Sequence, residues 1–153
     1  MIQRIQSIWL LLSSLSLVGL FFLPYMMYSN PVDLGRSIFV TGVKPPSGVE
    51  PSFLMMTIVA VILTLIPIFI IFQFKNRKLQ LKLILVQVIL VCLFAIWMWI
   101  TADGLRDVKE SGIHIGNIGI GYFTLPLSIL FISFAIRGIR NDEKLIKSAD
   151  RLR

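Results

Sequence analysis

Residues 53–74 read FLMMTIVAVILTLIPIFIIFQF, an apolar run without a single Asp, Glu, Lys, Arg or His. A helix rises about 1.5 Å per residue, so about 20 apolar residues cross the ~30 Å hydrocarbon core of a bilayer. Three further runs are similarly apolar, at about residues 5–28, 81–100 and 118–136, with Lys82 near the start of the third run of the chain as their one charged residue. The sequence therefore predicts an all-α membrane protein, a bundle of four transmembrane helices.

The composition of the whole chain agrees with four spans. Of its 153 residues, 56% are hydrophobic and only 15% are charged, and the formal net charge is +7. Four spans need about 80 apolar side chains, which is close to the whole supply. A soluble domain usually carries about 25% charged residues. The composition therefore excludes a soluble enzyme, a disordered tail and a nucleic-acid module that is merely basic.

The chain shows no internal repeat and no second domain, so residues 1–153 are predicted to form one integral membrane domain. The outer loops are expected at 29–52 and 101–117, and a cytoplasmic tail at 137–153. The first run resembles a secretory signal. It is too long for a signal core, however, and no small-x-small cleavage site follows it. We expect it to stay in the protein as the first span.

The charges predict the orientation of the spans. Eleven of the 15 Lys and Arg residues lie at the N-terminus, in residues 75–82 around the turn between the second and third runs, or in the tail. With acids counted, these segments carry +8 and the two other loops carry −1, which together give the net +7 of the chain. The positive-inside rule then places both termini in the cytoplasm. Five aromatic residues are expected at the outer interface, where amphipathic rings are favoured: Trp97, Trp99, Tyr25, Tyr28 and Tyr122.

The outer loops contain two short alternating stretches, Ser37–Thr41 and Ile113–Ile115, which predict strands that pair as a small β ribbon. His114, the only histidine, lies in the second stretch. A metal site needs three or four converging ligands, so His114 is interpreted as a solvated loop residue. The glycine-rich segment 116–121 lacks the spacing of a nucleotide-binding loop and indicates close packing instead.

The sequence offers no candidate catalytic, cofactor-binding or metal-binding residue. Cys92 is the only cysteine and lies within an apolar run, so it forms no intramolecular disulfide. Pumps, proton-coupled transporters and intramembrane hydrolases place charged or histidine side chains at membrane depth. The middle of each run contains none. We therefore expect a protein that is not an enzyme and uses no cofactor.

The predicted spans do contain small and polar residues at helical spacing. Such residues mark contacts between helices in lipid, where a buried glutamine seeks a partner on a neighbouring helix. At 100° per residue, one face of the third span carries Gln80, Gln87, Phe94 and Met98, and one face of the fourth carries Asn117, Gly121, Thr124, Ser128 and Ala135. The candidate packing residues are Gln87, Gly121, Thr124 and Ser128. A polar lining for a solute path is the alternative interpretation.

The tail is the most patterned soluble segment. Asn141 is expected to cap a separate helix over residues 142–152, with acidic residues in its first turn. The pattern is that of a short amphipathic helix, suited to an anionic membrane surface or a groove on a partner. The candidate contact residues are the apolar Leu145, Ala149 and Leu152 and the basic Arg140, Lys144, Lys147 and Arg151.

The two ends of the chain carry a resemblance to a known family. Residues 1–6, MIQRIQ, run straight into a span, and the chain closes with AIRGIRNDEKLIKSADRLR, residues 135–153. This plan resembles the domain-of-unknown-function family numbered 4293, small four-span proteins of the Bacteroidota. The resemblance implies a Gram-negative inner-membrane protein with a cytoplasmic C-terminus. The family has no assigned activity, so the resemblance transfers no catalytic residue.

Together these features predict a non-enzymatic inner-membrane protein, an accessory or scaffold component of a membrane complex. Its expected partners are the lipid bilayer and a protein, either another chain or a second copy, but not nucleic acid. The alternative is a small oligomeric transporter or channel with a path between protomers. A lipid-modifying enzyme that uses acids of the outer loops ranks behind both. A hydrated cavity lined by Gln87 and Ser128 would favour the transporter or channel. Packing of these residues without water would favour the accessory or scaffold protein.

Overall fold

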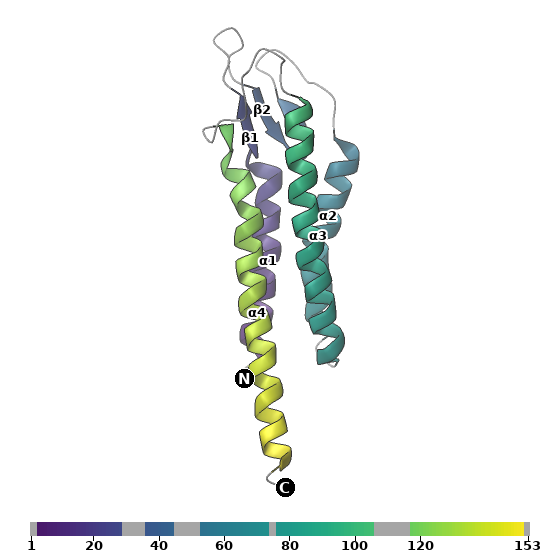
Figure 1. The fold of residues 1–153 in the computed structure, drawn as a ribbon, viewed down its shortest axis with the longest axis vertical. Helices are drawn as coiled ribbons and strands as arrows, with labels where there is room; N and C mark the ends of the chain where they lie inside the picture. Colours follow the sequence, from purple (N-terminus) through teal and green to yellow (C-terminus); the bar gives the residue numbers. More distant parts are fainter. Residues whose placement is uncertain (1–2, 29–35, 45–52, 74–75, 106–116, 152–153) are drawn as a thin grey trace.

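The computed structural model describes residues 3–28, 36–44, 53–73, 76–105 and 117–151, with only the helical backbone described for 143–151. Four helices run along the long axis of the molecule, and short strands gather at one end (Figure 1). The elements of this part of the chain are α1 (Gln3–Phe22), β1 (Met26–Tyr28), β2 (Arg36–Phe39), β3 (Gly42–Lys44), α2 (Leu54–Phe72), α3 (Arg77–Gly104) and α4 (Ile120–Arg151).

All four helices are long and apolar enough to cross a membrane, since the mean hydropathy of an 18-residue segment of each helix is between 1.6 and 2.9. They correspond in order to the four predicted runs. The first run was expected to continue to residue 28, but α1 ends at Phe22. Pro24 explains the early end, because it lacks an N–H and disfavours the helical conformation of the residue before it. The chain then enters β1.

The three strands form an antiparallel sheet in the order β1-β2-β3, with Met26 opposite Ile38 and Ser37 opposite Lys44. The predicted stretch Ser37–Thr41 thus contributes most of β2. Because β2 is the central strand, both of its edges are occupied by β1 and β3. The stretch Ile113–Ile115, which was expected to pair with it, lies outside the described residues.

The start of α4 docks directly on the end of α1. Gly119 N donates to Tyr25 O and Gly121 N donates to Pro24 O, each at 2.9 Å. A Cβ atom on Gly121 would lie only 2.5 Å from Leu23 O, so a larger residue does not fit without movement of the backbone. The glycine-rich segment therefore serves close packing, as the sequence indicated.

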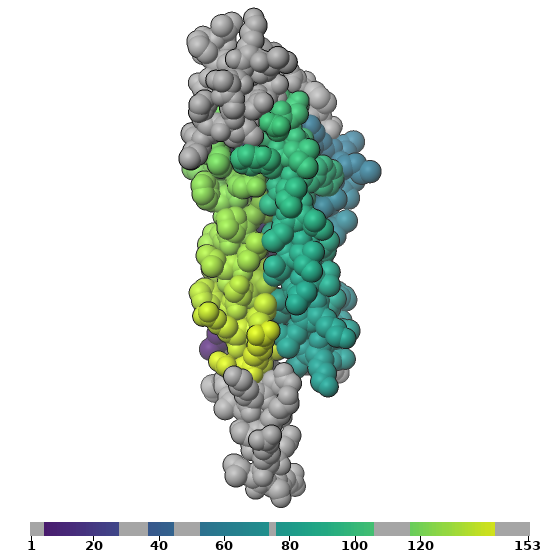
Figure 2. Space-filling model, viewed as in Figure 1, coloured from purple at the N-terminus to yellow at the C-terminus, as the bar shows by residue number. Residues whose placement is uncertain are grey.

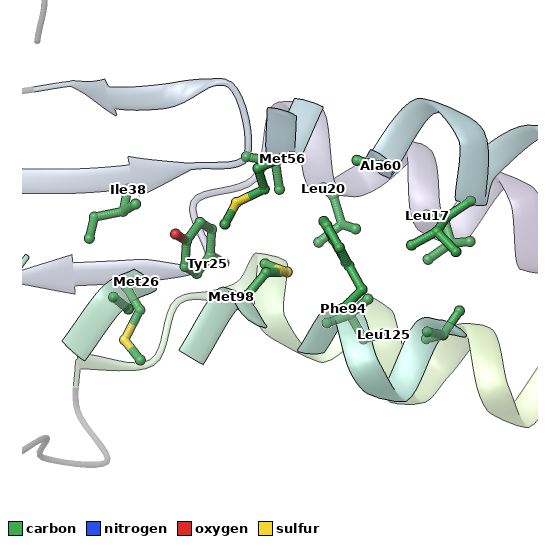
Figure 3. Packing of buried hydrophobic residues seen from close by; sticks show 14 of the residues in the cluster. Leu17, Leu20, Tyr25, Met26, Ile38, Met56, Ala60, Phe94, Met98 and Leu125 are labelled. Atoms are coloured by element: carbon green, nitrogen blue, oxygen red, sulfur yellow. The ribbon is translucent and has the colours of Figure 1, made fainter. Parts of the chain in front are cut away.

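The hydrophobic core has two parts. The sheet-side cluster includes Leu17, Leu20, Tyr25, Met26, Ile38, Val91, Phe94 and Leu125, and Figure 3 shows how its members from the helices and the strands converge. The turn-side cluster, nearer the α2–α3 turn, consists of Leu10, Ile70, Ile84, Ile132, Ala135 and Ile139. Tyr25, which the sequence analysis places at the outer interface, is fully buried among the members of the sheet-side cluster.

Helix α4 continues without interruption to Arg151. Asn141 therefore lies inside a helix and does not cap a second one, which corrects the sequence prediction. In Figure 1 the final turns of α4 project beyond the ends of the other three helices. The tail is thus an extension of the fourth helix and not a separate element.

Candidate functional site

A layer of polar side chains separates the two apolar clusters. Along α1, α3 and α4, a polar residue stands about one turn from a member of each cluster, for example Gln87 between Ile84 and Val91, and on α2 Thr64 lies between Leu63 and Ile70. We call this set the polar layer; its members are all buried and are Ser13, Ser14, Thr64, Gln87 and Ser128. Every helix contributes at least one member, so the layer crosses the whole bundle.

Hydroxyl groups of α1 connect this helix to both of its neighbours. The Oγ atoms of Ser13 and Ser128 lie 2.9 Å apart, which links α1 to α4. One residue along, Ser14 Oγ donates to Thr64 O of α2 at 2.8 Å. Small side chains let the helices approach closely enough for these short contacts. Helix α1 is therefore the centre of the layer.

Gln87 connects α3 to α2 at a carbonyl group that lacks its usual donor. Its Nε2 atom donates to Leu63 O at 3.0 Å. In a regular helix that carbonyl would accept from the N–H of the residue four positions later, which here is Pro67 and has no N–H. The glutamine thus replaces the hydrogen bond that the proline removes. Gln80 lies seven residues before Gln87 on α3, and its Nε2 atom makes a longer contact of 3.4 Å with Ile70 O.

The predicted packing residues all lie in contacts between helices. Gln87 is 1% exposed and Ser128 is 0% exposed. Thr124 is buried, its Oγ1 donates to Gly121 O at 2.7 Å, and its own carbonyl accepts from Ser16 Oγ at 2.8 Å. Gly121 contacts the end of α1 as described above. The four residues therefore line the α4–α1 and α3–α2 contacts.

One buried polar pair was missed by the sequence reasoning. Gln6 Nε2 donates to Asp142 Oδ2, and the two residues are only 7% and 6% exposed. Gly138 makes room for the pair, since a Cβ atom there would lie 2.9 Å from Gln6 Cγ. The available signal was the seven-residue spacing from Ser128 through Ala135 to Asp142, which continues the packed face of α4. The sequence analysis places Asp142 in the first turn of a separate helix, whereas the structure places it within α4.

The predicted cytoplasmic contact residues fall mostly beyond the described side chains. Arg140 is exposed on α4. Lys144, Leu145, Lys147, Ala149 and Arg151 lie in the stretch for which the helical backbone is described, and Leu152 lies outside the described residues. His114 also lies outside them. The contact face proposed from the sequence therefore stays a prediction.

The polar layer consists of neutral groups, which bond to each other or to backbone carbonyl groups, while Gln87 Oε1 has no hydrogen-bond partner among the described residues. A hydroxyl nucleophile needs a base within hydrogen-bond reach, and the partner of Ser13 is another serine hydroxyl. Within the described ranges, no group of three or more His, Cys, Asp or Glu side chains could hold a metal ion. The arrangement fits the joining of helices better than it fits a reaction.

Comparison with known proteins gives one finding. The model of a family described as "Domain of unknown function (DUF4293)" matches residues 2–152. The comparison with curated proteins and the comparison with solved structures each gave no match.

Proposed function

This chain belongs to the DUF4293 family, whose description names no activity, and from its own residues we propose a non-enzymatic, multi-pass protein of the bacterial inner membrane. We propose further that it serves as an accessory or scaffold component of a membrane complex. The observation that carries this proposal is the continuation of α4 past the bundle as one helix. The distribution of charge, the polar layer and the exposed apolar surface support it.

Membrane insertion is supported by the outer surface of the helices. Large apolar side chains are exposed along α2 and α3, among them Ile62, Leu65, Phe69, Leu93 and Ile96. Figure 2 shows α3 and α4 lying side by side on one face of the molecule. Side chains of this kind are unfavourable in water but match lipid tails, since lipid is as apolar as leucine.

The proposed orientation places the basic end of the bundle in the cytoplasm. The N-terminus, the turn between α2 and α3, and the C-terminus lie at the end opposite the sheet (Figure 1). The sequence segments at that end carry the +8 described above, which supports an orientation with both termini inside.

Reporter fusions test this orientation. A reporter after Arg153 should be active in the cytoplasm, and a reporter inserted between Pro45 and Pro46 should be active on the outer side. The same location for both reporters would contradict the proposed topology. A mature protein that starts near Ser29 would contradict the retained first span.

The packed state of the polar layer supports a structural role over a solute path. Gln87 and Ser128 are almost completely buried and bond to neighbouring helices. A path between protomers would instead need such groups to face water or a second chain. For this reason the channel alternative ranks second.

The projecting part of α4 supports a protein partner over the lipid surface. The segment apolar enough to span a membrane ends at Asp142, and the helix continues to Arg151. At 1.5 Å per residue, the extension reaches about 13 Å beyond the span. A helix that continues its transmembrane axis does not lie flat on the inner leaflet. The apolar face that the sequence pattern gives to this extension, with Leu145 and Ala149, would then suit a cytoplasmic protein or a second copy.

A charge-matched pair of variants tests the partner. Leu145→Asp with Leu152→Asp lowers the net charge by two on the apolar face. Lys147→Gln with Arg151→Gln lowers it by the same amount on the opposite face. Each tagged protein is purified from its native membrane in mild detergent, and the proteins that accompany it are identified.

We expect the first variant to lose its partner and the second to keep it, with normal membrane insertion in both cases. Loss in both variants would indicate attraction by charge alone. If neither variant changed the co-purified proteins, the tail would be only a topological anchor and the scaffold proposal would fail.

A further inference from the structure

A cleft lies between the first turn of α2 and the last two turns of α3. Its volume is about 320 Å³, at the lower end of the range of about 300–1,000 Å³ that small-molecule sites occupy. Its lining is mostly apolar and consists of Phe53, Leu54, Met55, Met56, Trp97 and Thr101. None of these side chains is charged.

The cleft stands at the end of the α2–α3 interface that has no glutamine contact. Gln80 and Gln87 reach the carbonyls of Ile70 and Leu63 in the other half of the two helices, towards their connecting turn. These contacts hold the helices together near the turn. Between Met55 and the end of α3, the two helices bring apolar residues of the sheet-side cluster together, Met56 and Met98 among them, and the cleft lies beside these residues.

The mouth of the cleft opens sideways, away from the core. Leu54 and Met55 are 68% and 72% exposed, and Trp97 is 39% exposed, whereas Met56 at the back of the cleft is 2% exposed. The neighbouring surface of both helices is also apolar, as at Ile58 and Ile100. With α2 and α3 in a membrane, the medium at this mouth is lipid hydrocarbon.

We propose that an acyl chain of a membrane phospholipid occupies this cleft as a bound ligand. An unfilled space would cost the lining its dispersion contacts, and a flexible hydrocarbon chain supplies them. Trp97 and Thr101 bring an indole N–H and a hydroxyl to the rim, and the hydroxyl donates to Trp97 O at 2.9 Å. Residues of this amphipathic kind suit the level of the lipid glycerol and ester groups.

The lack of charge in the lining defines the chemistry of the ligand further. None of the described lining residues carries a positive charge, so none of them would select an anionic headgroup. The ligand class is therefore the diacyl phospholipid, recognised by its chain and not by its headgroup. The proposal requires that the helices span a membrane, but it does not depend on a partner of the tail.

Native mass spectrometry of the full-length chain, purified from bacterial membranes in mild detergent, tests the proposal. We expect one phospholipid to stay with the wild-type protein after repeated exchange of the detergent. Thr101→Trp and Met55→Trp fill the cleft and should lose this phospholipid. Ile96→Trp is the matched control, because Ile96 is exposed on α3 but does not line the cleft.

Equal retention by Thr101→Trp and Ile96→Trp, or no retained phospholipid in the wild-type protein, would overturn the proposal. A change of oligomeric state in Thr101→Trp with unchanged phospholipid retention would assign the cleft to a second copy and would overturn it as well.

A second measurement needs no substitution and so does not depend on the folding of a variant. A phospholipid with a photoactivatable group on its acyl chain should label Met55 and Trp97 in the membrane-embedded wild-type chain more strongly than Leu65 and Phe69, which are exposed on α2 outside the cleft. Uniform labelling of these four positions would overturn the proposal.

Discussion

Replacing Gln87 by leucine removes the amide that donates to Leu63 O. An average interhelical hydrogen bond in a membrane protein contributes about 0.6 kcal/mol. Here the loss is larger, because Pro67 provides no N–H and the carbonyl loses the side-chain donor that replaced it. A buried acceptor without a donor costs about 1–3 kcal/mol, and we expect Gln87→Leu to lower the free energy of unfolding by that amount.

Two further variants isolate this effect. Pro67→Ala restores the backbone donor to Leu63 O, so Gln87→Leu in that background should cost about 0.5 kcal/mol or less. The difference between the two costs, about 0.5–3 kcal/mol, is the coupling energy of a double-mutant cycle. Gln80→Leu is the matched control on the same helix. It should cost little, because its acceptor Ile70 O also receives Gln73 N at 3.1 Å.

The free energies would be measured by equilibrium unfolding of the purified chain, followed through its helical circular dichroism as a denaturing detergent is added to a mild one. Equal costs for Gln87→Leu and Gln80→Leu would refute the reasoning. So would an equal cost of Gln87→Leu in the wild-type and Pro67→Ala backgrounds, since Leu63 O would then not depend on Gln87.

Two other packing predictions use thermal unfolding in mild detergent. Gly121→Ala should lower stability by about 1–3 kcal/mol, because the new Cβ atom meets the backbone of Leu23 and Pro24, just after α1. Gly104→Ala should leave stability unchanged or raise it by up to about 1 kcal/mol, because that Cβ atom has nothing within 4 Å. Ser128→Phe should also cost about 1–3 kcal/mol, whereas Ser133→Phe on the exposed side of α4 should be tolerated. Equal stability of the two serine variants would mean that Ser128 faces lipid and that the helices are arranged differently.

The polar layer explains how four apolar helices choose one alignment. Apolar side chains pack against one another in many registers. Lipid provides no hydrophobic driving force that would favour one of these registers over another. A hydroxyl or amide buried in the bundle finds its partner in only one register. Ser13 with Ser128, and Gln87 with Leu63, would both lose their partners if a helix moved by one turn. The layer therefore favours this alignment over its neighbours.

The number and order of the helices follow from the sequence alone, because the length of an apolar run is a local property. Each of the four predicted runs corresponds to a helix long and apolar enough to cross a membrane. The inward face of α4 was also visible, since Gly121, Thr124 and Ser128 recur at helical spacing. Periodicity identifies a face without reference to any other helix.

Periodicity does not identify which helix packs against that face. Only the tertiary structure shows which residues become partners. Ser13 and Ser128 are 115 residues apart, and Gln6 and Asp142 are 136 residues apart. From the sequence, Asp142 was expected in the first turn of a separate helix capped by Asn141. In the structure Asp142 is buried against Gln6, and α4 continues through it to Arg151. The capping signal of Asn141 was local, and packing of α4 against the start of α1 outweighs it.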